Sequence, residues 1–200
     1  MEHHLLPFFV VEAMVWNDLE TARLILRPLR AEDADVLVRE LNDFAIARNT
    51  ARIPHPYHRS DALEFLDFAA SGVARSRIAG VEEKTSPGQL IGVISYEWHE
   101  ASDNAELGYW YSQAMWGKGI GSEAGRAMVD DAFGREGHRE LIACYHNDNA
   151  ASARILVKLG FEVTGPCSSY SKAQGREVPV TNLSLSRERW RQGVQNTLAT

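Results

Sequence analysis

The stretch that decides the fold reads Trp116-Gly-Lys-Gly-Ile-Gly-Ser-Glu-Ala124, with glycines at positions 117, 119 and 121. It lies between a strand-like and a helix-like segment. Three glycines in five residues allow positive φ angles, and they let backbone N–H groups approach a ligand without side-chain obstruction. The helix that follows presents unpaired N–H groups and the positive end of its dipole. The stretch therefore predicts a phosphate-binding loop. The alternative interpretation is a tight turn that binds no ligand.

Three kinds of phosphate-binding loop compete for this stretch. The P-loop pattern GxxxxGK[ST] fails, because Gly119 follows Gly117-Lys118. Residues 119–124 formally fit the dinucleotide pattern GxGxxA. The strand before them contains Glu106, however, whereas the first strand of a dinucleotide-binding sheet is buried on both faces. Too little chain follows to complete such a sheet, so an acyl-CoA ligand remains.

A second segment, residues 149–161, favours acyl-CoA. It predicts a short helix in which Asn149 is the N-cap, and Leu156 and Leu159 belong to the buried face. Gly160 suits the left-handed residue that ends a helix. A purely structural helix explains these residues well, but it explains less well why the helix follows the glycine loop at this distance.

The rest of the chain predicts one mixed α/β domain. Strands are expected over 21–29, 78–82, 90–98, 104–111, 141–145, 161–165 and 178–185, with helices beginning near residues 31, 60, 121 and 149. Strands and helices alternate through the middle of the chain, and no repeat or interdomain linker interrupts them.

Taken together, these motifs resemble the GNAT superfamily of N-acetyltransferases, specifically its RimJ/RimL-like branch. Residues 116–124 resemble the pyrophosphate-binding motif, and Asn149…Ser152…Lys158-Leu-Gly-Phe161 resembles the second CoA-binding motif. Residues 21–29 and 105–110 resemble the first and fourth strands of that branch. The resemblance implies an N-terminal extension over 1–17, an acetyltransferase domain over 18–187 and a C-terminal tail over 188–200.

The resemblance also implies a mostly antiparallel central sheet, flanked by helices and split between its fourth and fifth strands. Acetyl-CoA would lie in the split as a co-substrate, with no metal. Backbone amides of residues 117–121 would hold the pyrophosphate, and the main chain of residues 109–111 would pair with the pantetheine arm. The expected cofactor-binding residues are Tyr109, Trp110, Tyr111, Trp116, Gly117, Lys118, Gly119, Ile120, Gly121, Ser122, Asn149 and Ser152.

The reaction implied is acetyl transfer to a primary amine by direct attack in a ternary complex. The amine must lose a proton, and Glu106 is the expected base; the alternation of the strand puts it on the face with Trp110. A solvent-facing strand glutamate is the alternative. Many superfamily members have a tyrosine general acid where Leu156 stands. Ser152, Tyr145 or solvent would replace it, although Ser152 fits equally well as a first-turn cap of its own helix.

The composition limits which classes of partner the protein is expected to bind. The net charge of −6 argues against non-specific nucleic-acid binding, and no apolar run approaches the roughly 18 residues that span a bilayer. Cys144 and Cys167 form neither a disulfide framework nor a zinc pattern. We therefore expect a cytoplasmic enzyme, monomeric or homodimeric. The resemblance implies that its acceptor is a protein N-terminus or a small amine, and that the loop at residues 49–60, with Tyr57, borders the acceptor. A non-catalytic acyl-CoA-binding module on the same fold is the alternative.

Overall fold

The computed structural model describes residues 17–72 and 74–198, so the expected N-terminal extension lies almost wholly outside the described residues. Its elements in chain order are β1 (Leu19–Glu20), β2 (Leu24–Arg27), the 3-10 helix η1 (Ala31–Asp33), α1 (Ala34–Leu41), α2 (Phe44–Ala47), α3 (Arg59–Ala70), β3 (Arg77–Glu83), β4 (Leu90–His99), β5 (Asn104–Tyr111), the 3-10 helix η2 (Gln113–Met115), α4 (Ile120–Gly134), β6 (Glu140–His146), α5 (Ala150–Leu159), β7 (Glu162–Ser171), β8 (Arg176–Ser186) and α6 (Arg187–Leu198).

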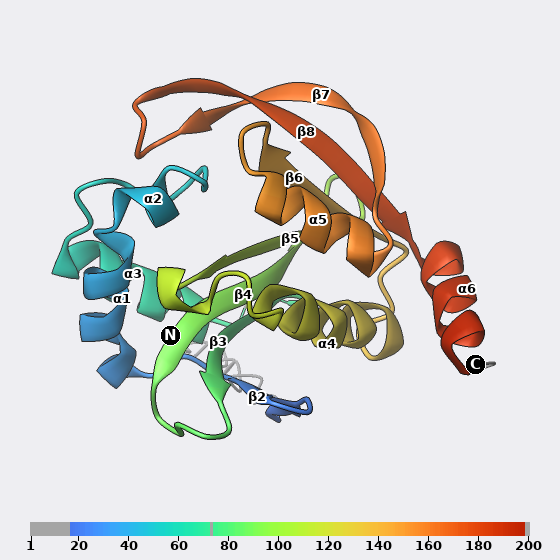
Figure 1. Cartoon of the computed structure of the whole chain (residues 1–200), viewed down its shortest axis with the longest axis horizontal. Helices are drawn as coiled ribbons and strands as arrows, with labels where there is room; N and C mark the ends of the chain where they lie inside the picture. Colours follow the sequence, from blue (N-terminus) through green and yellow to red (C-terminus); the bar gives the residue numbers. More distant parts are fainter. Residues whose placement is uncertain (1–16, 73, 199–200) are drawn as a thin grey trace, which may run out of the picture.

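One eight-stranded sheet organises the molecule, in the order β1-β2-β3-β4-β5-β6-β8-β7 (Figure 1). Every neighbouring pair is antiparallel except β5 and β6. The expected mixed, mostly antiparallel sheet is confirmed. A doubly wound dinucleotide-binding sheet is excluded, because that fold requires mostly parallel strands.

The expected split of the sheet lies between β5 and β6. The two strands pair in parallel only at Ala105↔Leu141 and Glu106↔Ile142. Among the described residues, no strand pairs with the rest of β5 on this side, so β5 and β6 part toward their C-terminal ends. Since the two-residue β1 was not predicted, the expected fourth and fifth strands carry the labels β5 and β6.

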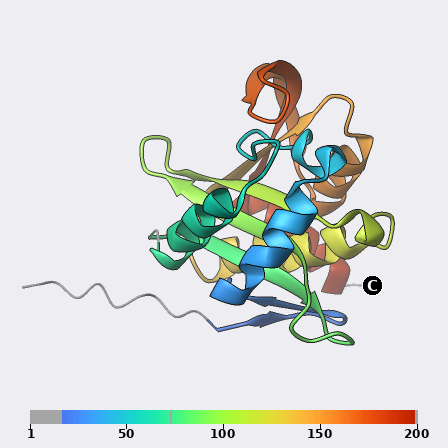
Figure 2. The same ribbon diagram turned by 90° about the vertical axis from the view of Figure 1, so that its left-hand side faces the viewer.

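Helices cover both faces of the sheet, and each face has its own hydrophobic core. Helices α4 and α5 pack on one face, where Leu107 and Tyr111 of β5 are buried. Helices α1 and α3 cross the other face, where Trp110 is buried (Figure 2). The predicted alternation of β5 is therefore correct: its side chains point alternately to the faces of the two hydrophobic cores.

The C-terminal part of the chain differs from the expected pattern. Strands β7 and β8 form a long curved hairpin at one edge of the sheet, and both strands are longer than the ones predicted (Figure 1). The residues expected as a tail contain helix α6, which packs against α4 through a stacked contact between Trp190 and Phe133. The Trp190 Nε1–H also donates to Asp130 at 2.7 Å. Within residues 17–72 and 74–198, no helix is long and apolar enough to cross a membrane.

Candidate active site

The glycine loop adopts the backbone conformation that its sequence predicts. Gly117 and Gly119 have φ angles of +76° and +80°, and Gly119 is the left-handed N-cap residue from which α4 begins at Ile120. In the described part of the chain, the amides of Gly119, Gly121 and Ser122 donate to no other group. Free N–H groups at a helix N-terminus can bind an anion.

A polar anchor from the segment between β1 and β2 holds this loop. Glu123, in the first turn of α4, accepts hydrogen bonds from the Thr21 hydroxyl at 2.6 Å and from the Arg23 amide at 2.8 Å. Arg23 also pairs with Glu123 through Nε at 2.7 Å and donates to the Lys118 carbonyl at 3.1 Å. Burial opposes ionisation of Glu123, but these hydrogen bonds outweigh it and lower its pKa. These contacts connect the glycine loop to the segment that precedes β2.

Gly121 and Ile120 have roles that differ from those of the first two glycines. Gly121 lies inside α4, and a Cβ atom built there would approach Ile155 Cδ1 to 2.7 Å and Tyr111 Cε2 to 3.2 Å. Gly121 therefore allows α4 to pack closely on α5 and β5. The side chain of Ile120 is buried in the core, so only its backbone faces the loop.

The free edge of β5 is available for pairing. Ser112 donates its N–H to the Ile91 carbonyl of β4 at 2.9 Å. Because hydrogen-bonded residues alternate along an antiparallel pair, Leu107 and Tyr109 direct their backbone groups away from β4, into the split. The Tyr111 carbonyl on that side already accepts from Trp116 Nε1 at 2.8 Å, so Trp116 ties the glycine loop to the end of β5. The side chain of Trp110 points to the opposite face.

Tyr109 and Ser152 meet across the split. The Tyr109 hydroxyl lies 2.9 Å from Ser152 Oγ. Asn149 caps α5, since its side-chain oxygen accepts from the Ser152 amide at 3.0 Å. The Ser152 hydroxyl therefore contacts Tyr109, and Asn149 fills the capping role. Leu156 is buried in the core, and Tyr145 packs against that core from β6.

Glu106 lies on the opposite face of β5, where the strands separate. Its side chain is 45% exposed, and its Oε2 lies 3.5 Å from His99 Nε2. The cross-strand neighbour of Glu106 is Glu97 on β4. Arg52 forms a two-pronged ion pair with Glu97, one contact being 2.8 Å. Burial opposes ionisation of Glu97, but the pairing with Arg52 outweighs it and lowers the pKa of Glu97.

The loop expected to border the acceptor is partly built into the fold. Tyr57 is 4% exposed and belongs to the core beneath α1 and α3, and Asn42 hydrogen-bonds to both its amide and its carbonyl. Burial supports the packing role for Tyr57. Nearer the start of this loop, the Ala51 carbonyl accepts a hydrogen bond from the Lys172 amide at 2.9 Å, so the tip of the β7–β8 hairpin contacts the loop.

Cys144 shares the face of Glu106, because Ile142 pairs with Glu106 and Cys144 is two residues further along β6. Burial, and then the charge of Glu106, raises the pKa of its thiol to about 11. The described residues contain no group of three or more His, Cys, Asp or Glu side chains that could hold a metal.

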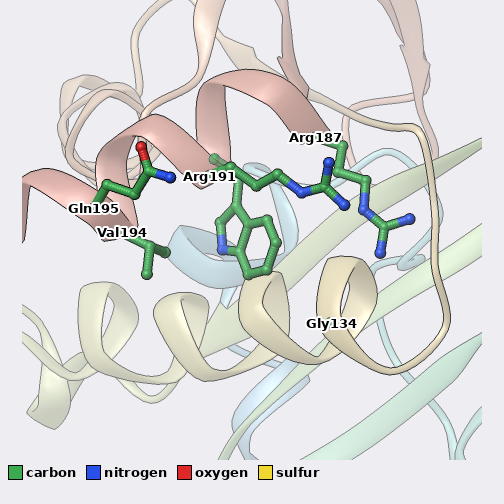
Figure 3. Close-up of a pocket in the computed structure, with 6 residues that line it drawn as sticks. Gly134, Arg187, Arg191, Val194 and Gln195 are labelled. Carbon is green, nitrogen blue, oxygen red and sulfur yellow. The ribbon is translucent and has the colours of Figure 1, made fainter.

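A separate hollow lies at the far end of α4. It has a volume of about 440 Å³ and is lined by Gly134, Arg187, Trp190, Arg191, Val194 and Gln195 (Figure 3). Helix α4 begins at the glycine loop and ends at this hollow. Its 15 residues separate the two by about 20 Å, at 1.5 Å per residue, so the hollow is not part of the site.

Sequence patterns alone did not identify Arg23, Glu123 or Arg52. Arg23 and Glu123 lie 100 positions apart, and no local spacing links them. Arg52 reaches Glu97 from a loop whose path the sequence does not define. The sequence offered one indication of these three residues, which was their charge. Each is a charged residue in or next to a segment that the motifs had already identified.

Comparison with known proteins identifies the family. The model of the acetyltransferase (GNAT) domain matches residues 23–162. An uncharacterized N-acetyltransferase, p20, of Bacillus licheniformis is 28% identical over 176 residues, which cover 86% of this chain and 97% of that protein. The ribosomal-protein-serine acetyltransferase of Escherichia coli (strain K12) is 37% identical over 79 residues, covering 38% of this chain and 44% of that protein. Among solved structures, the ribosomal L7/L12 α-N-protein acetyltransferase RimL in complex with coenzyme A matches with a TM-score of 0.74 at 16% identity, covering 85% of this chain and 98% of that one. The chain thus belongs to the GNAT acetyltransferase family, in its RimJ/RimL-like branch, and is an acetyl-CoA-dependent N-acetyltransferase.

Proposed function

We propose that the enzyme acetylates a primary amine by direct attack in a ternary complex, with Glu106 as the base and Ser152 as the donor to the departing thiolate. One observation carries the proposal. The unpaired edge of β5 has Tyr109 and Ser152 on one side of the sheet and Glu106 on the other. An acyl donor lying along this edge would therefore be approached by the amine from the Glu106 side.

The residues of the split fit acetyl-CoA. The free amides at the start of α4 suit the pyrophosphate, and the backbone groups of Leu107 and Tyr109 suit the amides of the pantetheine arm, which can pair as an added strand. When bound there, acetyl-CoA supplies the activated acetyl group. The chain supplies orientation and the proton-handling groups.

The acceptor side supports a cationic acceptor. An α-amino group has a pKa near 7.7–8.0 and a lysine side chain one near 10.4, so either arrives largely protonated. Glu106 is half-exposed, so an incoming ammonium group can reach it. Glu97 already forms an ion pair with Arg52. Of the two carboxylates, Glu106 is therefore the one more available to an incoming ammonium group.

The alternative chemical route, through an acetylated cysteine, is disfavoured. Burial raises the pKa of the Cys144 thiol to about 11, so on the order of one molecule in 10⁴ carries the nucleophilic thiolate at pH 7. We expect initial rates measured against both substrates to give intersecting double-reciprocal lines. Parallel lines, together with an acetylated protein detected by mass spectrometry, would instead indicate a covalent intermediate.

The acceptor is best sought by direct screening. A protein N-terminus and a small amine both fit the proposal, and the Escherichia coli relative is named for acetylating a ribosomal protein. Release of the CoA thiol should be measured with peptides that have free N-termini, the same peptides with blocked N-termini, polyamines and amino acids. Activity that requires a free N-terminus would identify a protein acceptor, and activity with polyamines or amino acids alone would identify a small amine. If no amine releases thiol, the proposed function is wrong.

Replacing Glu106 by glutamine tests the base. Glu106→Gln keeps the shape of the side chain and removes the proton acceptor, so kcat should fall by roughly 10²–10⁴ at neutral pH. Acetyl-CoA binding, measured by calorimetry, should be unchanged, and activity should partly return at high pH, where the amine loses its proton unaided. Glu97→Gln is the matched control, since it makes the same change on the neighbouring strand. A parent-like kcat for Glu106→Gln at every pH would remove Glu106 from the mechanism.

A further inference from the structure

The contact between Tyr109 and Ser152 is made by two elements that are distant in sequence. Tyr109 comes from β5 and Ser152 from the first turn of α5, on the two sides of the split. The Tyr109 hydroxyl lies 2.9 Å from Ser152 Oγ and 3.4 Å from the Ser152 carbonyl oxygen. The shorter distance is typical of a hydrogen bond between two hydroxyl groups, whereas the longer one is marginal.

The Ser152 hydroxyl is not needed by its own helix. A serine in the first turn of a helix commonly caps a backbone N–H. Here the Asn149 side chain accepts from the Ser152 amide at 3.0 Å. Asn149 therefore provides the side-chain cap of α5, and the Ser152 side chain is available for another task.

The direction of the hydrogen bond follows from the chemistry of the two hydroxyl groups. Burial raises the pKa of Tyr109 to about 12, so the phenol keeps its proton at physiological pH. A phenol is also the stronger hydrogen-bond donor, since an aliphatic alcohol is the weaker acid. Tyr109 therefore donates to Ser152 Oγ, and the proton of Ser152 remains free to point elsewhere.

We propose that Tyr109 is a positioning residue, which fixes the Ser152 hydroxyl so that its proton faces the leaving sulfur. The inference rests on the proposed function. The amine nitrogen bonds to the acetyl carbon as the carbon–sulfur bond breaks, and the electron pair of that bond stays on sulfur. Ser152 donates its proton to this sulfur and regains one from solvent, while the proton lost by the amine goes to Glu106. The hydrogen bond from Tyr109 makes this donation easier, because it stabilises negative charge on Ser152 Oγ.

The position of Tyr109 explains how the leaving thiolate can be protonated although position 156 has no tyrosine. Leu156 is 1% exposed and fills the core one turn further along α5, where it can donate no proton. Ser152 supplies a shorter hydroxyl one turn earlier, on the same helix. A short side chain needs a partner to define its orientation, and the phenol of β5 provides one.

The test compares Tyr109→Phe with Tyr96→Phe. Tyr96 lies on β4, and its hydroxyl donates to buried Asp131 of α4, outside the site. Each variant loses one hydrogen bond, part-buried at Tyr109 and buried at Tyr96, so both should unfold at a lower temperature. Only Tyr109→Phe should lower kcat, by about ten- to hundredfold, as expected for one hydrogen bond to a developing charge. The KM for acetyl-CoA should change by less than about twofold, because the change acts on the reaction and not on ground-state binding.

A double-mutant cycle with Ser152→Ala separates positioning from a merely structural effect. If Tyr109 acts through Ser152, the double variant should be no slower than Ser152→Ala alone, and Ser152→Thr should recover part of the activity. Additive losses would overturn the inference. A parent-like kcat for Ser152→Ala would also overturn it, and this result can be obtained even if Tyr109→Phe fails to fold. Amine-dependent thiol release by the parent, and its loss in Glu106→Gln, test the proposed function separately. If those results hold while Tyr109→Phe turns over at the parent rate, this inference alone is wrong.

Discussion

At the scale of single residues, the glycine loop shows how one backbone angle sets the start of a helix and the direction of its first amides. Gly119 has a φ angle of +80°, a conformation that costs L-residues about 1–2 kcal/mol and β-branched residues more. Among the described residues, a Cβ atom there would meet only Arg23 Nη2, at 3.4 Å. The requirement for glycine is therefore conformational, since there is space for a side chain.

The Gly119→Val variant should consequently weaken acetyl-CoA binding. Valine would turn the residue out of the left-handed region and redirect the amides at the start of α4, so the dissociation constant measured by calorimetry should rise about tenfold or more. Gly134→Ala, at the other end of α4 with nothing within 4 Å of the new Cβ, is the control and should bind normally. Equal affinity in two proteins that circular dichroism shows to be folded would refute the phosphate-binding loop.

What the sequence could reveal about single residues was limited to their local roles. The positive φ angles of Gly117 and Gly119 were predicted correctly, since a turn that precedes a helix defines its own backbone requirements. Gly121 was grouped with them, but its small size serves the contact with Ile155 on α5. The pairing of Tyr109 with Ser152 spans 43 positions, and no pattern in the chain encodes that contact.

At the scale of elements, helices and strands with one buried face were predictable, and those without such a face were not. The pattern of β5 alternates, and its predicted limits are those of the structure. Strand β7 is exposed along most of its length, so only its first residues were expected as a strand. Helix α2 has four residues, too few for a helical period, and α6 is rich in Arg and Gln.

The packing of α4 on α5 gives a prediction at this scale. A Cβ atom at Gly125 would lie 2.7 Å from Leu159 Cδ1, and Leu159 is buried. Gly125→Leu should therefore separate the two helices and lower the free energy of unfolding by about 1–3 kcal/mol, the usual cost of overpacking. Gly134→Ala on the same helix has open space and should not destabilise. Urea unfolding of both variants checks this, and a Gly125→Leu variant as stable as the parent would contradict the tight contact.

At the scale of the whole molecule, stability should depend on pH through histidines buried without charge. His138 is fully buried; its Nε2–H donates to the Arg75 carbonyl at 2.8 Å, and its Nδ1 has no partner in the described part of the chain. Burial lowers its pKa, and the charge of Arg75 acts in the same direction. The hydrogen bond to the Arg75 carbonyl and the charges of Glu136 and Asp103 oppose this lowering but do not outweigh it. Burial also lowers the pKa of His146. The folded protein therefore resists protonation at two positions.

The sign of the effect follows from proton linkage. In the unfolded chain these histidines titrate near pH 6.5, so between that value and their lower folded pKa the unfolded state binds more protons. The free energy of unfolding must then be greatest above about pH 6.5 and fall as the pH drops toward the folded pKa. Urea unfolding at about pH 7.5 and about pH 5.5 should show this loss before carboxylates such as Glu123 begin to titrate. His138→Gln keeps a donor for the Arg75 carbonyl but has no titrating group, so the difference between the two pH values should shrink. An unchanged difference in that variant would show that His138 does not control the acid sensitivity of the fold.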